Sequence, residues 1–517
     1  MKTKLVGVLL SSALCLSVAT AAPSTEFGQQ GRQSGEGLCR RAAALPPMPR
    51  EVAVRDERQQ RRRGERVTAM EAPPPDPVPT PMPAPPAYAA EDSDSVVVTG
   101  SRVPAPVMSS PSPVATMSAD GRSAEGLVAE ASPPAPERGY GRVAQPQAGQ
   151  LTAGDHDDLL NPDLYADYVA KFLQSQWRDD VPILDTRRVL TVAVQDRAGR
   201  PVPFAPVRLT CADGNSLTLE TLADGTAVFF PGLDRLGDRV RMAVDRGDTR
   251  EILLSGEAGA QRHTVTLGTR APLVTRFDLA IVLDTTGSMG DEIEFLKSEL
   301  RSIVAELRRG HPNLDIRLAL VAYRDEGDVF VTRTYPFTGN ESAMQASLRA
   351  QSADGGGDYP EAMDQALARA TALDWRPDAV RSLLLVADAP PHEENVAKTW
   401  MVAEAARARR IQIVPVAASG VAVLAEYVMR AMATATQSRY LFLTDDSGIG
   451  NPHAPPAIDC HLVTRLDTLV RRVLDGQISG RRIEPRDGEI IRAVGQYDNG
   501  RCILPPDFKA QELDRRQ

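Results

Sequence analysis

The feature that most constrains the fold is an alternation of apolar strands and amphipathic helices that begins at Arg276. Residues 277–283 (FDLAIVL) have the continuous apolar character of a buried parallel strand, and residues 292–309 repeat apolar side chains at helical spacing. Further strands are predicted at 316–322, 382–387, 411–417 and 440–443, with helices such as 362–372 and 396–410 between them. We therefore predict an α/β fold, a doubly wound and mostly parallel sheet with helices on both faces.

A second folded unit is predicted at residues 183–270, where the apolar period changes to two. Val192 and Val194 alternate with polar neighbours, and turn signals such as Asp224-Gly225 separate short strands. This pattern predicts a small antiparallel β-sandwich. Its order of strands and turns resembles the carboxypeptidase-regulatory or transthyretin-like sandwich, which implies a spacer or docking face rather than a site of chemistry.

The first 150 residues differ in composition from the rest. They hold 21 of the 41 prolines but 3 of the 24 aromatic residues, too few to build a core. We predict a disordered, proline-rich tether at 22–150, a docking helix within 155–180, and a C-terminal extension at 481–517. The formal charge of −9 argues against nucleic acid as a partner.

The N-terminus has the three parts of a secretory signal peptide. Lys2 and Lys4 precede the apolar run 5–16, and small residues follow up to Ala21. We expect residues 1–21 to be cleaved near Ala21 and the protein to be exported to the periplasm or the extracellular space. No later segment has the length and apolar character of a transmembrane helix.

One island in the tether is rich in β-branched residues. Asp94 to Arg102 (DSVVVTGSR) resembles the TonB box of outer-membrane receptors, which implies pairing with the sheet edge of a partner through Val96, Val97 and Val98. The alternative is a chance apolar patch in a linker.

Four cysteines remain after removal of the signal: Cys39, Cys211, Cys460 and Cys502. They allow three complete pairings, and the sequence does not choose among them. We favour a disulfide between Cys460 and Cys502, which flank the last predicted helix and strand and would stabilise the C-terminus by about 3 to 4 kcal/mol. Free or differently paired thiols remain the alternative.

Oxygen-bearing side chains follow the predicted parallel strands. The first strand ends in Asp284-Thr285-Thr286-Gly287-Ser288, and a later strand ends in Asp388. Between them lies the loop 355–361 (GGGDYPE), where Asp358 leads into a helix. Hard oxygen ligands without histidine or thiolate favour Mg²⁺, Mn²⁺ or Ca²⁺.

These residues resemble the von Willebrand factor A (vWA) family, whose metal-ion-dependent adhesion site (MIDAS) has an Asp-x-Ser-x-Ser loop, a threonine and a further aspartate. The resemblance covers residues 274–480. It implies that Asp284, Thr286, Ser288 and Asp388 bind a divalent cation, most simply Mg²⁺, and that Asp358 stands where the family has threonine. Three carboxylates around one cation would weaken its attraction for the acidic side chain of a partner.

We therefore expect a noncatalytic, cation-dependent protein-binding module at a bacterial cell envelope. A metal-independent scaffold is the first alternative. The second is a Mg²⁺-dependent phosphotransferase of the haloacid-dehalogenase type with Asp284 as nucleophile, although Thr286 occupies the place of that family's second aspartate. A Ser288 hydrolase would need a histidine such as His392, His453 or His461, and it leaves Asp388 without a role.

Overall fold

The computed structural model describes residues 38–41, 43–48, 146–176, 178–244, 249–254, 259–450 and 453–508. The predicted signal peptide, the valine island at 96–98 and most of the predicted tether lie outside these residues.

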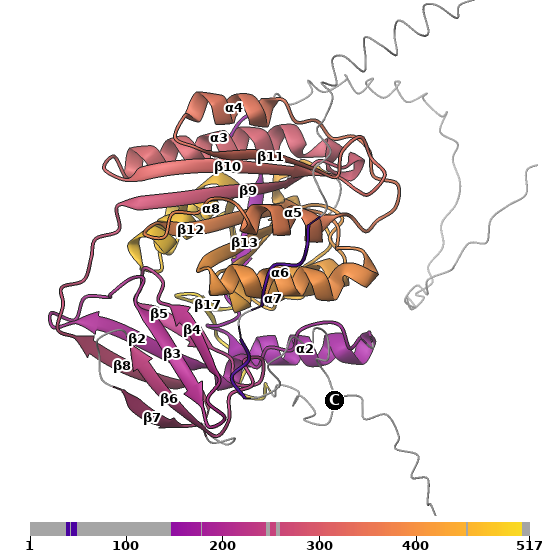
Figure 1. Cartoon of the computed structure of the whole chain (residues 1–517). Helices are drawn as coiled ribbons and strands as arrows, with labels where there is room; N and C mark the ends of the chain where they lie inside the picture. The colour runs from indigo at the N-terminus through magenta and orange to yellow at the C-terminus, as the bar shows by residue number, and fades with distance from the viewer. Residues whose placement is uncertain are drawn as a thin grey trace, which may run out of the picture. The chain divides into compact units, whose positions relative to one another are not determined.

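A nine-stranded mixed sheet forms the centre of the α/β part (Figure 1), in the order β11-β10-β9-β12-β13-β14-β1-β15-β16. The neighbours from β10 to β14 pair in parallel, whereas β11, β1 and β16 run against their neighbours. The strands are β1 (Thr152–His156), β9 (Arg276–Asp284), β10 (Asp315–Tyr323), β11 (Thr332–Thr338), β12 (Val380–Ala387), β13 (Ile411–Ala417), β14 (Tyr440–Thr444), β15 (His461–Arg465) and β16 (Arg492–Val494).

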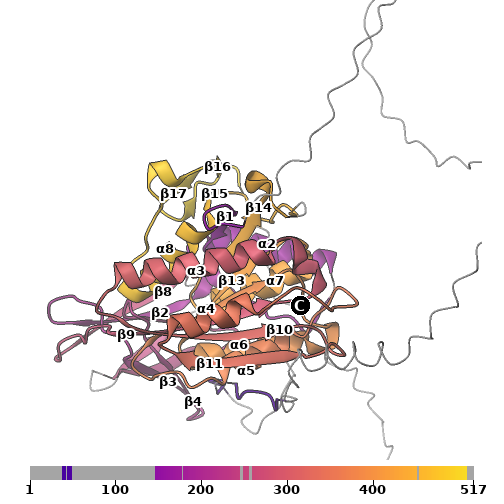
Figure 2. The ribbon, with the colours of Figure 1, turned by 90° about the horizontal axis from the view of Figure 1, so that it is seen from above.

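Helices cover both faces of this sheet (Figures 1 and 2), as the alternation predicted. Alternate residues of β9 enter two separate cores, Ala280 and Val282 on one face and Leu279 and Ile281 on the other. The first core includes residues of α2 (Pro162–Ser175), α5 (Met363–Thr371), α6 (Val396–Ala408) and α7 (Val423–Ala435). The second includes residues of α3 (Ile293–Gly310), α4 (Glu341–Arg349) and α8 (Leu466–Ser479). The predicted fold class is confirmed.

Strand β1 is an N-terminal segment inserted between β14 and β15. Its sequence, TAGDH, has no apolar alternation and was not predicted as a strand. It is nevertheless fully buried, because Thr152 to His156 pair antiparallel with β14. After the turn at 157–161 the chain forms α2, where Phe172 stacks on Tyr427 of α7 at 3.9 Å between ring centroids.

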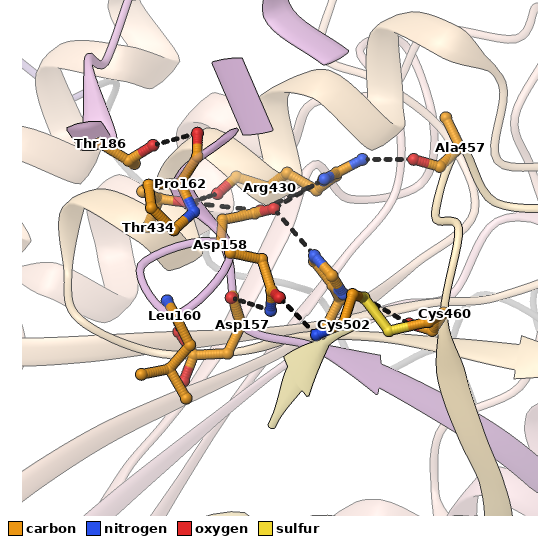
Figure 3. Close-up of polar contacts among 12 residues, drawn as sticks. Asp157, Asp158, Leu160, Pro162, Thr186, Arg430, Thr434, Ala457, Cys460 and Cys502 are labelled. Atoms are coloured by element: carbon orange, nitrogen blue, oxygen red, sulfur yellow. Dashed lines mark hydrogen bonds and ion pairs between the residues drawn. A yellow bond between two sulfur atoms is a disulfide. The ribbon is translucent and has the colours of Figure 1, made fainter. Parts of the chain in front are cut away.

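A buried ion pair connects this N-terminal segment to α7 (Figure 3). Arg430 of α7 donates to both carboxylate oxygens of Asp158, at 2.6 and 3.2 Å, and to the carbonyl of Ala457 at 2.9 Å. Both side chains of the pair are at most 2 % exposed. The guanidinium also lies 3.8 Å from the ring centre of Tyr168, so one arginine links the turn after β1, α2 and α7.

The C-terminal extension completes the sheet and then contacts the N-terminal segment. It contains β16, β17 (Tyr497–Asp498) and β18 (Arg501–Cys502). The structure contains the predicted Cys460–Cys502 disulfide. Beside it, Asn161 donates to the carbonyl of Gly500 and accepts from the amide of Cys502, both at 2.8 Å.

The segment 183–270 folds as two facing small sheets, β5-β2-β8 and β4-β3-β6-β7, around one apolar core. The strands are β2 (Leu190–Asp196), β3 (Pro206–Cys211), β4 (Ser216–Glu220), β5 (Thr226–Phe229), β6 (Arg239–Val244), β7 (Arg250–Leu253) and β8 (Gln261–Leu267). The expected antiparallel arrangement needs one correction, because β2 and β8 pair in parallel. A second disulfide, Cys39–Cys211, fastens residues of the expected tether to this unit.

The sandwich contacts the α/β part at the end of α6. Arg407 forms a bidentate ion pair with Asp234 at 2.7 and 2.8 Å, and Arg410 pairs with Glu220 at 3.0 Å. Arg410 also donates to the carbonyl of Ala379, which precedes β12. These contacts lie at the edge of the sheet where the parallel strands begin. The loops that follow the strands lie at the opposite edge.

His461 predicts an acid-sensitive stability. The ring is 5 % exposed and packs edge-on against Phe442, and burial, reinforced by the charges of Arg492 and His156, lowers its pKa to about 4. Because an unfolded histidine titrates near pH 6.5, the unfolded chain binds a proton that the folded chain does not. His461 should therefore contribute a loss of about 3 kcal/mol of stability as the pH falls from about 6.5 to about 4, whereas buried carboxyl groups with raised pKa values, such as Asp284 and Asp388, contribute in the opposite direction.

The measurement is the free energy of unfolding across that range for the wild type, His461→Gln and, as a control in the sandwich, His263→Gln. Relative to the wild type, His461→Gln should gain about 3 kcal/mol between pH 6.5 and pH 4, and His263→Gln should show no such difference, because the contributions of the carboxyl groups and of the buried His156, whose pKa is also lowered by burial, are common to all three proteins. Equal slopes in all three proteins would contradict the prediction.

Within the described residues, no helix combines the length and apolar character needed to cross a bilayer.

Candidate functional site

The loop after β9 brings one carboxylate and two hydroxyls together. Oδ1 of Asp284 accepts from the amide of Thr286 at 3.0 Å and from its hydroxyl at 2.7 Å. The Thr286 hydroxyl lies 3.1 Å from that of Ser288. Asp284 and Thr286 are fully buried, whereas Ser288 is exposed, so the group opens to solvent at Ser288.

The triglycine loop packs directly on this first loop. The amide of Gly287 donates to the carbonyl of Gly355 at 3.0 Å, and the amide of Gly356 donates to Asp328 at 2.9 Å. Gly355 and Gly356 have positive φ angles, and a Cβ on Gly355 would lie 2.4 Å from the Asp328 carboxylate. Glycine is therefore required here, both for its backbone conformation and for the close approach.

Two further carboxyl groups reach the same place from other loops. Asp388 follows β12, and Glu361 stands just before α5, where its amide donates to the carbonyl of Pro390 at 3.0 Å. Both side chains are 2 % exposed. Oδ2 of Asp284, Oδ1 of Asp388 and Oε2 of Glu361 are buried and have no hydrogen-bond partner among the described residues. The Tyr323 hydroxyl is buried beside Asp284, and burial, followed by the charge of Asp284, raises its pKa.

The electrostatics show that these acids face one another. Burial, followed by the charge of Asp284, raises the pKa of Asp388 to about 7. Burial also raises the pKa of Asp284 to about 6, against the hydrogen bonds from Thr286. The pKa of Glu361 rises to about 9, first through burial and then through the charges of Asp284, Asp325 and Asp388. Like charges at short range and low solvation favour the neutral form of each group.

Asp358 does not join this cluster in the structure. Its side chain is exposed, and the buried carboxyl of the GGGDYPE loop belongs to Glu361. Asp284, Thr286, Ser288 and Asp388 are thus brought together as expected, and Glu361 was missed. A usable signal was present, since Glu361 immediately precedes the apolar start of α5, whereas Asp358 follows three glycines at the tip of the loop.

The donor set suits a hard divalent cation. Carboxylate and hydroxyl oxygens are the ligands that Mg²⁺ and Ca²⁺ prefer, and buried oxygens without partners are costly unless something compensates them. The described residues contain no group of three or more His, Cys, Asp or Glu side chains arranged to hold a metal ion. A cation here would therefore be held by hydroxyls as well as carboxylates, namely Thr286 and Ser288 with Asp284 and Asp388.

A histidine bridge borders the site. His453 lies 2.8 Å from Glu292 and 2.7 Å from Asp445, one carboxylate at each ring nitrogen. Glu292 is fully buried and accepts from the amide of Ser419 at 3.3 Å. Against the effect of burial, these two carboxylates raise the pKa of His453. This bridge connects the loops after β9, β13 and β14.

Comparison with known proteins identifies part of the chain. Residues 278–450 match a family model described as von Willebrand factor A domain. An alpha-protein kinase vwkA of Dictyostelium discoideum is 32 % identical over 120 residues, 22 % of this chain and 19 % of that protein. The putative ariadne-like RING finger protein R811 of Acanthamoeba polyphaga mimivirus is 34 % identical over 124 residues, 23 % and 12 % of the two chains.

A human relative, von Willebrand factor A domain-containing protein 7, is 41 % identical over 85 residues, 16 % of this chain and 9 % of that one. The chain thus spans about a fifth or less of these relatives. Among solved structures, the conserved hypothetical protein BatB from Bacteroides thetaiotaomicron has 16 % identity and a TM-score of 0.28, with 39 % of this chain and 98 % of that chain covered. A von Willebrand factor type A structure from Catenulispora acidiphila has 17 % identity and a TM-score of 0.29, with 40 % and 43 % covered.

Proposed function

From the premise that the chain contains a vWA domain, which indicates a protein-interaction module, we propose that it binds a protein partner through the carboxyl edge of its parallel strands and that a divalent cation organises this edge. We further propose that the role is noncatalytic and that the protein is exported and acts at a bacterial cell envelope, as its N-terminal sequence suggests.

One observation carries the proposal. Asp284, Glu361 and Asp388 come from three separate loops, are each at most 2 % exposed, and each keep one buried carboxyl oxygen without a partner among the described residues. Burying acids together in this way destabilises a fold unless a proton or a cation compensates them. A bound cation would supply positive charge to these oxygens and to the Thr286 and Ser288 hydroxyls.

The test is the thermal stability of the full chain during titration with Mg²⁺, Mn²⁺ and Ca²⁺. A cation at a hundredfold excess over its dissociation constant should stabilise the wild type by about 2.7 kcal/mol. Asp284→Asn removes a ligand and should abolish the effect. Asp358→Asn is the matched control, since this exposed carboxylate lies outside the buried group, and it should respond like the wild type.

Absence of stabilisation by all three cations in the wild type would reject the cation site and leave the metal-independent scaffold. The same proteins test the phosphotransferase alternative. This alternative is worth testing because one relative is named as a kinase. Release of phosphate from a generic ester by the wild type, abolished in Asp284→Asn, would reject the noncatalytic role.

A further inference from the structure

The loops at the carboxyl edge are far more acidic than the rest of the chain. The loops 284–292, 324–331, 351–362, 388–395, 418–423 and 445–456 contain fourteen Asp or Glu residues and one Arg. The remaining residues have a small excess of basic side chains, because the whole chain has 68 acidic and 59 basic residues. The negative charge of the protein is therefore concentrated at this edge.

Basic groups neutralise only part of this surface: Arg492 pairs with Asp446, and His392 pairs with Asp325. Arg324 is 4 % exposed, donates to the carbonyl of Ser352 at 3.1 Å, and lies 3.5 Å from Asp354. The exposed carboxylates include Glu326, Asp358 and Glu394. The buried group lies at the same edge, where Glu361 and Asp388 each keep a partnerless oxygen and are 2 % exposed. An anion approaching this edge meets repulsion, whereas a cation meets attraction.

Apolar side chains lie among these charges. Val329 is 56 % exposed, Tyr359 44 % and Val423 50 %, and all three belong to the same loops or to the start of α7. The Tyr359 hydroxyl donates to the carbonyl of Gly420 and accepts from the amide of Ala422, both at 2.8 Å. Tyr359 is thus held against the segment that leads into α7, whose first residue is Val423. Exposed aromatic and aliphatic side chains surrounded by charge are typical of protein interfaces.

We propose that this carboxyl edge is a docking surface for a protein segment that presents arginine or lysine next to apolar side chains, and not for a partner's carboxylate. The inference deepens the proposed function and rests on it, since it assigns the chemistry of the partner at the same edge. The basic groups would pair with the exposed carboxylates, and the apolar groups would cover Val329, Tyr359 and Val423.

The test is fluorescence anisotropy of the full chain with two labelled peptides that differ in one respect. One alternates arginine with leucine, and the other has glutamate in place of arginine. The arginine peptide should bind both with and without Mg²⁺, and its affinity should decrease with rising salt concentration. The glutamate peptide should not bind. The triple variant Glu326→Gln, Asp358→Asn, Glu394→Gln should weaken binding of the arginine peptide about tenfold.

The matched control removes three exposed charges from the sandwich: Asp213→Asn, Asp238→Asn and Glu251→Gln. Its affinity for the arginine peptide should equal that of the wild type. Equal losses in both triple variants, or binding of the glutamate peptide alone in Mg²⁺, would overturn the inference. The cation titration is a separate measurement, so failure of the cation site and failure of the basic partner are told apart.

The sequence Arg61-Arg62-Arg63 has the same basic chemistry as the arginine peptide, so this segment of the chain is the alternative that the experiment tests. If its replacement by serine raised the affinity for the arginine peptide, the surface would belong to this segment, and the assignment to an external partner would be overturned.

Discussion

Replacing Arg430 by methionine should lower the free energy of unfolding by about 3 to 5 kcal/mol. The guanidinium is 1 % exposed and is paired with Asp158, which is 2 % exposed. Methionine would leave the Asp158 carboxylate buried without its cation, and it would also remove the hydrogen bond to Ala457 and the contact with the Tyr168 ring. Urea unfolding at neutral pH, followed by circular dichroism, measures the change.

Two control variants separate charge burial from general damage. Arg276→Met breaks an ion pair with Asp378 in which both side chains are about half exposed, and it should cost less than about 1 kcal/mol. The double variant Arg430→Met, Asp158→Leu removes the Arg430–Asp158 pair and should recover part of the stability, because Glu426, which also pairs with Arg430, keeps its hydrogen bond from the amide of Ala457. A double variant as unstable as Arg430→Met alone would show that packing, rather than an unpaired carboxylate, sets the loss.

Removal of the Cys460–Cys502 disulfide by substituting alanine for both cysteines should cost about 4 kcal/mol. The disulfide closes an interval of 42 residues, and the expected loss follows from the greater chain entropy of the unfolded state. The loss is also local, because Cys502 lies beside Gly500, and Asn161 binds both of these residues next to the disulfide. The measurement is urea unfolding under oxidising conditions.

The second disulfide provides the comparison. Cys39→Ala with Cys211→Ala removes the covalent bond between Cys39 and the sandwich and leaves the C-terminal extension in place. Hydrogen exchange should therefore increase at 492–502 only when Cys460 and Cys502 are replaced. Increased exchange at 492–502 in both variants would contradict the local role of the Cys460–Cys502 bond.

Much of the α/β part could be predicted because its signals are local. The helix predicted at 292–309 appears as Ile293–Gly310, and the strand predicted at 411–417 appears with the same bounds. The helix buries apolar side chains at helical spacing, and the strand is a short run of residues that are all buried. Asp284 and Asp388 could likewise be placed at one edge, because the ends of neighbouring parallel strands must meet there.

The pairing partners of polar segments could not be predicted in this way. Strand β1 contains a glycine and an aspartate and has no apolar alternation, yet it lies inside the sheet, between β14 and β15. It is a strand because β14 and β15 offer unpaired backbone groups on both sides, a condition created by residues about 300 positions away. The parallel pairing of β2 with β8 has the same origin.

The sequence by itself determined the α/β class, the difference between the proline-rich first 150 residues and the rest, and the oxygen-rich loop from Asp284 to Ser288. These features follow from composition and periodicity, which depend on residues close together in the chain. Only the tertiary structure decided that Glu361, and not Asp358, is the buried acid of the GGGDYPE loop. It also decided that an N-terminal segment completes the sheet. Which carboxylate becomes buried away from solvent depends on how separate loops pack together, and that packing is a property of the whole fold.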